Sequence, residues 1–161
     1  MKTVVQKIFL DTTFLLPFFG IRPKIKKYSS TQFKETLKGF KEIHITYLSV
    51  YETKAKIFRM HKKGTISRTV LDKFWYALKI LLEDKRFFFH TYDESIDKNL
   101  NDFLEKYSLD IFDALILASA VNKTDILLTE DSSLLSINKD LENKIRIKNW
   151  EKLKNNHNLT P

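Results

Sequence analysis

The sequence contains no cysteine and only three glycines in 161 residues. Without cysteine, neither a disulfide framework nor a cysteine-rich zinc site can stabilise the fold, and a reducing, cytoplasmic setting is expected. The glycines, at positions 20, 39 and 64, are too far apart to form a loop that cradles phosphate, which disfavours P-loop and dinucleotide-binding functions. The four histidines, at positions 44, 61, 90 and 157, show no paired spacing suited to zinc.

Long apolar runs are missing as well. The most apolar stretches, 14–21 and 114–121, are far shorter than the roughly 20 residues that cross a bilayer. The sequence reaches the charged residue Asp11 too early to leave room for the apolar part of a signal peptide. We therefore expect neither a membrane span nor secretion.

Positive charge, by contrast, is abundant. Lysine and arginine number 28 against 20 acidic residues, and the resulting net charge of +8 attracts polyanions such as nucleic acid. The composition, 43% hydrophobic and 30% charged, is that of a globular protein, and the length fits one core. We expect a single domain over residues 1–154 and a polar C-terminal tail over residues 155–161.

Five short apolar runs without alternation are typical of strands that are covered on both faces. They are residues 7–10, 42–47, 86–90, 125–129 and 144–148. Between them, apolar residues recur at helical spacing over residues 28–40, 48–58, 70–82, 96–107 and 109–121. Strands that alternate with helices predict right-handed crossovers and a mainly parallel sheet with helices on both faces, which is the α/β class.

Two acidic residues directly follow expected strands. Asp11 ends the first strand and precedes Thr12 and Thr13, whereas Asp131 follows Thr129 after the fourth strand. Loops at the carboxyl ends of parallel strands converge on one crevice, so adjacent strands would bring these two carboxylates together. Each acid has an alternative as a local cap or turn residue. For Asp11 a function is favoured, because a charge that ends a buried strand needs a partner or a metal.

Two further acids are expected in helices. Glu52 follows the second strand, but Ser49 and Glu52 also match a capping box, which would need no function. Asp113 lies in the first turn of the most apolar helix, where Asp110 is the natural N-cap. Helical spacing brings the like charges of Asp110 and Asp113 close together, and a bound cation would relieve their repulsion. We favour a functional role for Asp113 and a capping role for Asp110.

These acids occur in motifs that resemble the PIN-domain nuclease family. Residues 8–13, Ile-Phe-Leu-Asp-Thr-Thr, resemble its opening strand motif, and Glu52 resembles its glutamate after the second strand. Residues 113–120, Asp-Ala-Leu-Ile-Leu-Ala-Ser-Ala, and residues 129–131, Thr-Glu-Asp, resemble its Asp-Ala helix and its Thr-x-Asp turn, which are the most specific motifs. The resemblance spans residues 7–150. The sequence departs from the family in a long basic and aromatic segment, 14–28.

The resemblance implies a PIN-like three-layer α/β/α fold with a five-stranded parallel sheet in the order 3-2-1-4-5. It also implies an endoribonuclease that depends on Mg²⁺ or Mn²⁺. Hard oxygen ligands suit these ions, and bound metal can convert water to hydroxide for attack on a phosphodiester. The residues expected to bind metal and catalyse are Asp11, Glu52, Asp113 and Asp131. The residues expected to support them are Thr13, Thr129 and Asp110.

RNA is the expected substrate, and basic residues near the acids are candidates for contacts with its phosphates. A solvated surface is the alternative for most of them. The candidates are Arg22, Lys24, Lys26, Lys27 and Lys54. Further basic residues lie on the helix that carries Glu52 and in the turn that follows it. They are Lys56, Arg59, Lys62, Lys63 and Arg68. Phe74, Trp75 and Tyr76 offer possible stacking surfaces, but their helical setting favours a core or a subunit interface.

Several roles remain open at the level of sequence. Many small PIN proteins are toxins of toxin-antitoxin pairs, each inhibited by a small antitoxin protein, whereas others process or degrade ribosomal RNA. A non-catalytic RNA- or protein-binding module is a further alternative. A phosphatase with Asp11 as nucleophile is the least favoured one, because its motif wants a second aspartate where Thr13 stands. A homodimer formed through the helix at 70–82 is also expected.

Overall fold

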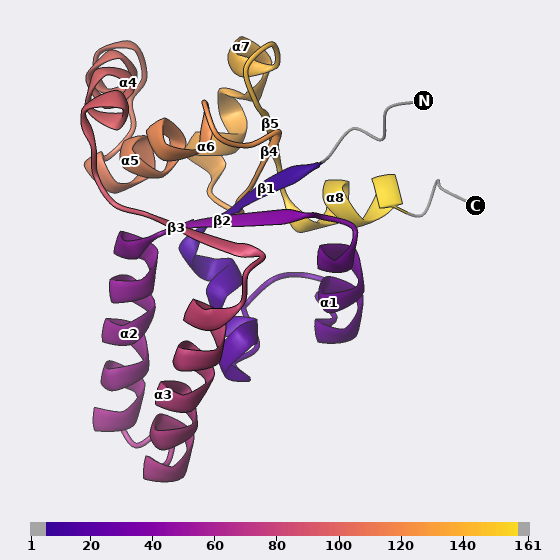
Figure 1. Ribbon diagram of the computed structural model, residues 1–161, viewed down its shortest axis with the longest axis vertical. Coiled ribbons are helices and arrows are strands. Elements are labelled where there is room, and N and C mark those ends of the chain that lie inside the picture. Colours follow the sequence, from indigo (N-terminus) through magenta and orange to yellow (C-terminus); the bar gives the residue numbers. More distant parts are fainter. Residues whose placement is uncertain (1–5, 158–161) are drawn as a thin grey trace.

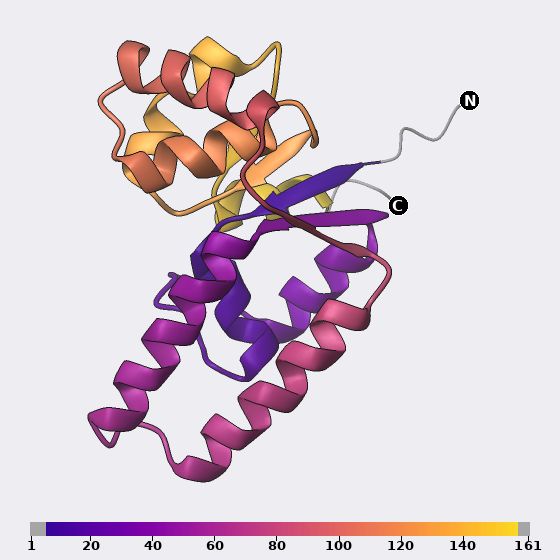
Figure 2. The same ribbon diagram turned by 60° about the vertical axis from the view of Figure 1, so that its left-hand side comes forward.

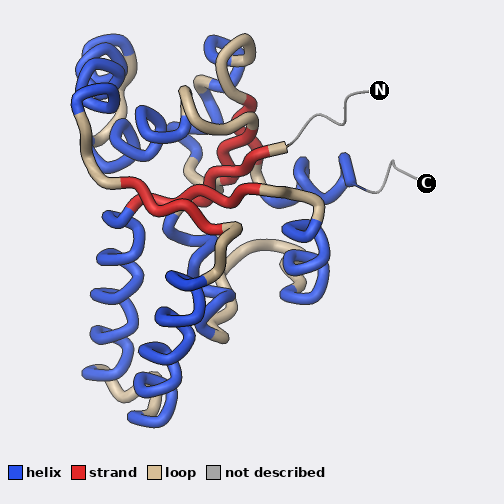
Figure 3. Tube along the Cα trace, in the orientation of Figure 1, coloured by secondary structure: helices blue, strands red, loops and turns tan. Residues whose placement is uncertain are grey.

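The computed structural model describes residues 6–157 and contains one sheet of five parallel strands in the order β3-β2-β1-β4-β5. This order confirms the expected fold. The strands form a central layer between helices (Figure 3). They are β1 (Lys7–Leu10), β2 (Glu42–Thr46), β3 (Phe87–His90), β4 (Ile126–Leu128) and β5 (Arg146–Lys148).

The strand register brings the ends of β1 and β4 to the same edge of the sheet. Leu10, the last residue of β1, pairs with Leu128, the last residue of β4. The backbone N–H of Asp11 then donates to the carbonyl oxygen of Leu128 at 3.1 Å. The residues that follow these two strands, Asp11 and Thr129, therefore lie side by side, as expected for neighbouring parallel strands.

Helices cover both faces of the sheet. One face carries the 3₁₀ helix η1 (Thr12–Phe19), α1 (Ser30–Lys38), α2 (Tyr47–Lys62) and α3 (Arg68–Glu83), while α8 (Trp150–His157) packs near α1 (Figure 1). The other face carries α4 (Glu94–Lys106), α5 (Ile111–Ala120), α6 (Ser132–Ser136) and α7 (Asn138–Leu141). No helix within residues 6–157 is long and apolar enough to cross a membrane.

The sheet divides the apolar core into two clusters. Ile8 and Leu10 of β1 point to the cluster that contains η1 and α1, whereas Phe9 points to the cluster that contains α4 and α5. All three side chains are fully buried, because successive residues of a strand face opposite sides and both sides are covered. This burial explains why the strand sequences are apolar without alternation.

The aromatic segment that follows β1 belongs to the core. Phe14 stacks on Phe33 with 5.8 Å between ring centroids, and Phe19 packs edge-on against Phe74 at 4.6 Å. Gly20 ends η1 with a φ of 72°, a backbone conformation that residues with a side chain rarely adopt. The apolar part of the departure from the family pattern therefore covers the sheet and does not form a substrate surface.

Helices α2 and α3 form a long hairpin that extends away from the sheet (Figure 2). Gly64 adopts a φ of 70° in the turn between them. Their contact is a small cluster of Ile57, Leu71 and Phe74. Tyr76 of α3, in contrast, is 70% exposed.

The last described helix reaches into the expected tail. Helix α8 continues to His157, so residues 155–157 are helical rather than irregular. Residues 158–161 of the expected tail lie outside the described residues. Trp150 is fully buried at the start of this helix, which anchors it to the core.

Candidate active site

Asp11 is held at the end of β1 by two hydrogen bonds. Its Oδ1 accepts the backbone N–H of Thr12 at 2.6 Å, and its Oδ2 accepts the hydroxyl of Thr129 at 2.7 Å. Burial raises the pKa of the Asp11 carboxyl, and the hydrogen bond from Thr129 opposes this rise. The carboxylate is therefore fixed in position at an edge where both central strands end.

Thr129 also connects Asp11 to Asp131. Its fully buried hydroxyl donates to Asp11 and accepts the backbone N–H of Asp131 at 3.0 Å. Asp131 in turn is the N-cap of α6, because its Oδ1 accepts the backbone N–H groups of Ser133 and Leu134. The capping alternative thus holds for Asp131, but the charge of Asp131 also raises the pKa of Asp11. Asp131 therefore caps α6 and also lies close enough to Asp11 for their two charges to interact.

Glu52 does not form the capping box that its sequence context suggests. Helix α2 begins earlier than that motif requires, and its N-cap is Thr46, whose hydroxyl oxygen accepts the backbone N–H of Ser49 at 3.0 Å. Glu52 instead lies in the second turn of the helix, where its Oε2 is 2.5 Å from the hydroxyl oxygen of Thr12. The capping alternative for Glu52 is therefore wrong.

The hydroxyl groups of two buried residues, Thr46 and Ser49, and of the half-buried Thr12 form a chain that ends at Glu52. The hydroxyl oxygen of Ser49 lies 3.0 Å from those of both Thr46 and Thr12. A carboxylate only accepts, so Thr12 donates its single hydroxyl proton to Glu52. Ser49 must then donate to Thr12, and Thr46 must donate to Ser49. This arrangement gives each hydroxyl a defined direction and holds Glu52 in one orientation.

Asp113 carries the strongest electrostatic conflict in the site. Asp110 is the N-cap of α5, as expected, and its Oδ1 accepts the backbone N–H groups of Phe112 and Asp113, each at 2.9 Å. Burial raises the pKa of Asp113 to about 6, with further contributions from the negative charges of Asp131, Asp110, Asp11 and Glu52. All four predicted carboxylates therefore lie within electrostatic reach of one another.

A cleft of about 300 Å³ lies between the turn after β1, α2 and α5. Three of the four predicted carboxylates, those of Asp11, Glu52 and Asp113, line the cleft, and Asp131 does not. Two exposed basic residues of α2, Lys56 and Arg59, also line it. The cleft therefore combines an acidic wall with positive charge at its rim.

The donor set suits a hard divalent cation. None of the ion pairs within 4.0 Å in residues 6–157 includes Asp11, Glu52, Asp113 or Asp131, so their mutual repulsion is not offset by a direct basic partner. No three His, Cys, Asp or Glu side chains within residues 6–157 are placed so that they could hold a metal ion together. The fit is therefore one of donor chemistry, because carboxylate oxygens are the ligands that Mg²⁺ and Mn²⁺ prefer.

The remaining predicted residues either do not line the cleft or have side chains that contact other parts of the protein. Thr13 is not part of the cleft lining, and the hydroxyl group that contacts Glu52 is that of Thr12. Among the predicted RNA contacts, Arg22 donates to the carbonyl oxygen of Tyr28 at 3.3 Å, and the ammonium group of Lys54 lies 4.6 Å from the ring centroid of Trp75. Lys24, Lys26 and Lys27 are exposed and do not line the cleft.

Two hydroxyl residues, Thr12 and Ser49, orient Glu52, and the sequence alone did not identify them. Ser49 was considered only as a cap of α2, yet it is fully buried beneath the cleft. The position of Thr12 beside Asp11 was visible in the sequence, but neighbouring threonines cannot be distinguished without the turn geometry. The 3₁₀ helix that begins at Thr12 provides that geometry.

The family model described as PIN domain matches residues 8–140. Similar solved structures include a toxin-antitoxin complex from Klebsiella pneumoniae, which is 18% identical with a TM-score of 0.57 and covers 81% of this chain and 92% of that one. A search of curated proteins found no significant match.

Two further solved structures share the fold over nearly the whole chain. VapBC2 from Rickettsia felis, bound to a DNA fragment from its promoter, is 16% identical with a TM-score of 0.59 and covers 90% of this chain and 99% of that one. PAE2754 from Pyrobaculum aerophilum is 17% identical with a TM-score of 0.58 and covers 98% of both chains. At such identities, the likeness shows the fold alone.

Proposed function

We propose that this chain, which belongs to the PIN domain family, is a metal-dependent endoribonuclease with Asp11, Glu52, Asp113 and Asp131 as its catalytic and metal-binding residues. Proteins of this family are nucleases that generally use divalent metal ions. The observation that carries the proposal is the crowding of carboxylates around one cleft, where burial and neighbouring charges raise the pKa of Asp113 to about 6. A divalent cation, Mg²⁺ or Mn²⁺, would relieve this repulsion.

The residues around the cleft would bind and orient the reactants. Bound Mg²⁺ or Mn²⁺ supplies an activated water and offsets negative charge on the attacked phosphate. Thr129 holds Asp11, and Thr12 holds Glu52, so both carboxylates are oriented before substrate binds. Lys56 and Arg59 at the rim are placed to contact phosphates of the RNA backbone.

The direct test is cleavage of labelled RNA by purified protein with Mg²⁺, with Mn²⁺ and with a chelator. We expect cleavage only with metal, and we expect the Asp11→Asn variant to be at least about 100-fold slower. The matched control is Asp102→Asn, which alters an exposed carboxylate on α4 and should cleave at the unmodified rate. Equal cleavage by Asp11→Asn, with contaminating RNase excluded, would overturn the proposal.

Calorimetric titration with Mn²⁺ separates this enzyme from a non-catalytic RNA- or protein-binding module. We expect the unmodified protein to bind Mn²⁺ and the Asp11→Asn variant to bind it at least about tenfold more weakly, because one ligand loses its charge. Absence of binding to the unmodified protein would favour the non-catalytic module.

We further propose that the biological role is that of a toxin in a toxin-antitoxin pair, acting in the cytoplasm as a homodimer. One of the structures that share the fold is a toxin-antitoxin complex, which supports this role by analogy. A short reading frame that precedes and overlaps this gene would encode the small antitoxin. Expression should then arrest growth, the Asp11→Asn variant should not, and co-expression of the small protein should restore growth. Metal-dependent cleavage without growth arrest would favour a role in ribosomal RNA processing or decay.

A further inference from the structure

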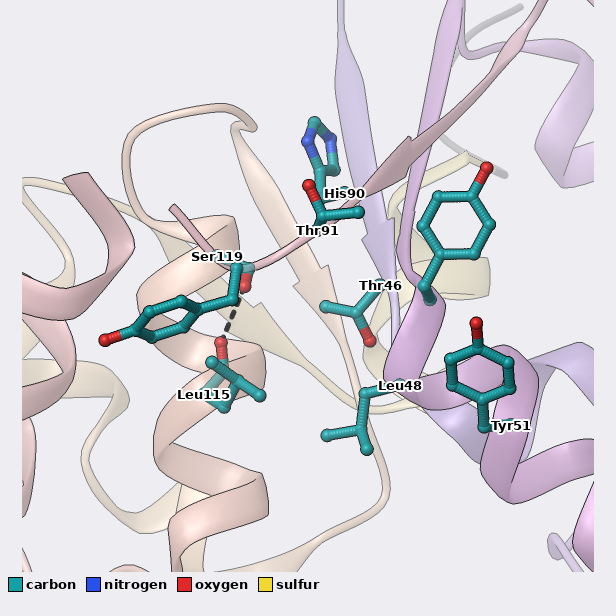
Figure 4. Close-up of a pocket in the computed structure, with 9 residues that line it drawn as sticks. Thr46, Leu48, Tyr51, His90, Thr91, Leu115 and Ser119 are labelled. Carbon is teal, nitrogen blue, oxygen red and sulfur yellow. Dashed lines mark hydrogen bonds between the residues drawn. The ribbon is translucent and has the colours of Figure 1, made fainter. Parts of the chain in front are cut away.

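A second cavity lies next to the acidic cleft, between the start of α2, the chain that follows β3, and α5 (Figure 4). Its volume is about 570 Å³, compared with about 300 Å³ for the acidic cleft. Leu48 and Tyr51 of α2 lie across the space from Leu115 and Ser119 of α5 (Figure 4). The volume is within the range of small-molecule pockets, roughly 300–1,000 Å³.

The lining of this cavity carries no charged side chain and combines aromatic and aliphatic groups with the hydroxyl groups of Thr46, Thr91 and Ser119. None of its 9 lining residues is Asp, Glu, Lys or Arg. Tyr51 and Tyr92 are 62% and 60% exposed, so both residues are accessible from solvent. A flat, uncharged group would lose little solvation on entering such a cavity, whereas a phosphate would find no positive partner there.

The one histidine in the lining, His90, is also uncharged at neutral pH. Burial lowers its pKa to about 4, and burial likewise lowers the pKa of its neighbour His44. His44 Nε2 lies 2.9 Å from the Glu42 carboxylate, which accepts, so neutral His44 presents an unprotonated Nδ1. That Nδ1 lies 2.7 Å from His90 Nε2, which must therefore carry the proton. Both rings are neutral and have defined tautomers.

The cavity and the acidic cleft share their walls. Leu48, which lines the cavity, and Glu52, which lines the cleft, are four residues apart on α2 and so lie on one face, about 6 Å apart along the axis. On α5, Leu115 lines the cavity and its neighbour Ile116 lines the cleft. One extended ligand chain can therefore place one group in the cavity and the next group along the chain in the acidic cleft.

We propose that this cavity holds one unstacked base of a single-stranded RNA while the neighbouring phosphodiester lies in the acidic cleft. This inference rests on the proposed ribonuclease function. Tyr51 and Tyr92 would stack on the base, a contact that is tolerant of sequence because every base has an aromatic face. A base that is paired in a duplex cannot enter the cavity, so the site selects single strands.

Binding is tested in the Asp11→Asn background, in which the RNA stays intact. The probe is a short single-stranded oligoribonucleotide that contains the fluorescent base 2-aminopurine. We expect Tyr51→Ala and Tyr92→Ala each to weaken binding about tenfold and to reduce the change in fluorescence on binding. The control is Tyr76→Ala, which removes another exposed tyrosine on α3, outside the cavity, and should bind like the background protein. A duplex of the same sequence should compete poorly.

Activity in the unmodified background distinguishes a base site from a structural role. Tyr51→Ala and Tyr92→Ala should raise the KM for RNA about tenfold but change the kcat at saturating RNA less than about twofold, and they should leave the affinity for Mn²⁺ in calorimetry unchanged. A matching loss of kcat or of Mn²⁺ binding would assign the tyrosines to the integrity of the cleft and would overturn the inference.

Two other outcomes separate the possible failures. If the unmodified protein cleaves RNA but the tyrosine variants match Tyr76→Ala, the cavity does not hold a base and the ribonuclease function stands. If the unmodified protein neither binds nor cleaves RNA, the function itself fails.

Sedimentation is measured in parallel, because a change of oligomeric state in the tyrosine variants would identify the cavity as a contact between copies of the chain and would contradict the inference.

Discussion

The hydroxyl oxygen of Thr12 lies 2.5 Å from Oε2 of Glu52, and this hydrogen bond joins the turn after β1 to the second turn of α2. The two residues are 40 positions apart in the sequence. Their contact gives Glu52 a partner outside its own helix. This hydrogen bond therefore shows that the Glu52 carboxylate points toward the cleft and does not cap its own helix.

Replacing Thr12 by valine should reduce cleavage while leaving the fold intact. Valine has a similar shape but cannot donate to Glu52, and a hydrogen bond to a charged group contributes about 1.5–3 kcal/mol. We expect RNA cleavage to fall about 10- to 100-fold. Thr13→Val is the matched control, since Thr13 does not line the cleft, and its rate should change less than about twofold. A larger loss for Thr13→Val would assign the orienting role to the wrong threonine.

Thr129→Val should lower both stability and activity. The change removes the hydrogen bond to Asp11 and leaves the Asp131 N–H without its partner, at a cost of about 2–3 kcal/mol by chemical denaturation. The comparison is Thr124→Val, which removes one hydrogen bond to a backbone carbonyl oxygen and should cost about 1 kcal/mol without affecting cleavage. Thr129→Ser keeps the hydroxyl and should restore most of the activity. Equal activity of all three variants would count against the role of Thr129.

Asp113→Asn should stabilise the metal-free protein at neutral pH. Because the pKa of Asp113 is raised from 3.8 to about 6, the folded protein binds more protons than the unfolded chain within that window, and stability falls as the pH rises through it. We expect Asp113→Asn to be more stable by about 1 kcal/mol at pH 7, after allowance for screening by solvent, and equal to the unmodified protein below about pH 4. The measurement is denaturant unfolding across this pH range in chelator. Asp102→Asn should show no such dependence, and a constant difference at all pH values would exclude the charge effect.

Removal of positive charge at the cleft should weaken RNA binding more than removal of distant charge. Lys56 and Arg59 line the cleft, whereas Lys24 and Lys26 do not. In the Asp11→Asn background, Lys56→Gln combined with Arg59→Gln should weaken binding several-fold and reduce its dependence on salt. The paired change Lys24→Gln and Lys26→Gln removes the same net charge and is the control. Equal effects of the two pairs would indicate only a general attraction of RNA.

The sequence predicted the strands of the sheet well because strand formation depends mainly on residues that are neighbours along the chain. Ile8, Phe9 and Leu10 are apolar in succession, a pattern typical of a short strand covered on both faces, and all three are fully buried. The motifs of the PIN family supplied the strand order. The limits of the elements were less certain, since α2 begins one residue before the expected helix and α8 was not expected at all.

The candidate site was predictable in part for the same reason. Asp11 and Asp131 follow apolar strands, and the sequence alone indicates that charges at such positions emerge where parallel strands end together. Asp110 was correctly assigned as a cap, because N-capping depends on the next three residues only. For Glu52, the local pattern also matches a capping box with Ser49 as the cap, but Thr46 is the N-cap of α2.

The sequence by itself determined which residues form strands and which acids follow them. Only the tertiary structure decided that Thr12 rather than Thr13 contacts Glu52 and that His44 pairs with His90, although the histidines show no paired spacing in the sequence. It also decided that Lys56 and Arg59, rather than Lys54, face the acids. The reason is physical: strand formation and capping depend on neighbours along the chain, whereas these contacts depend on a turn, a strand register and a helix rotation that are fixed only when the whole core packs.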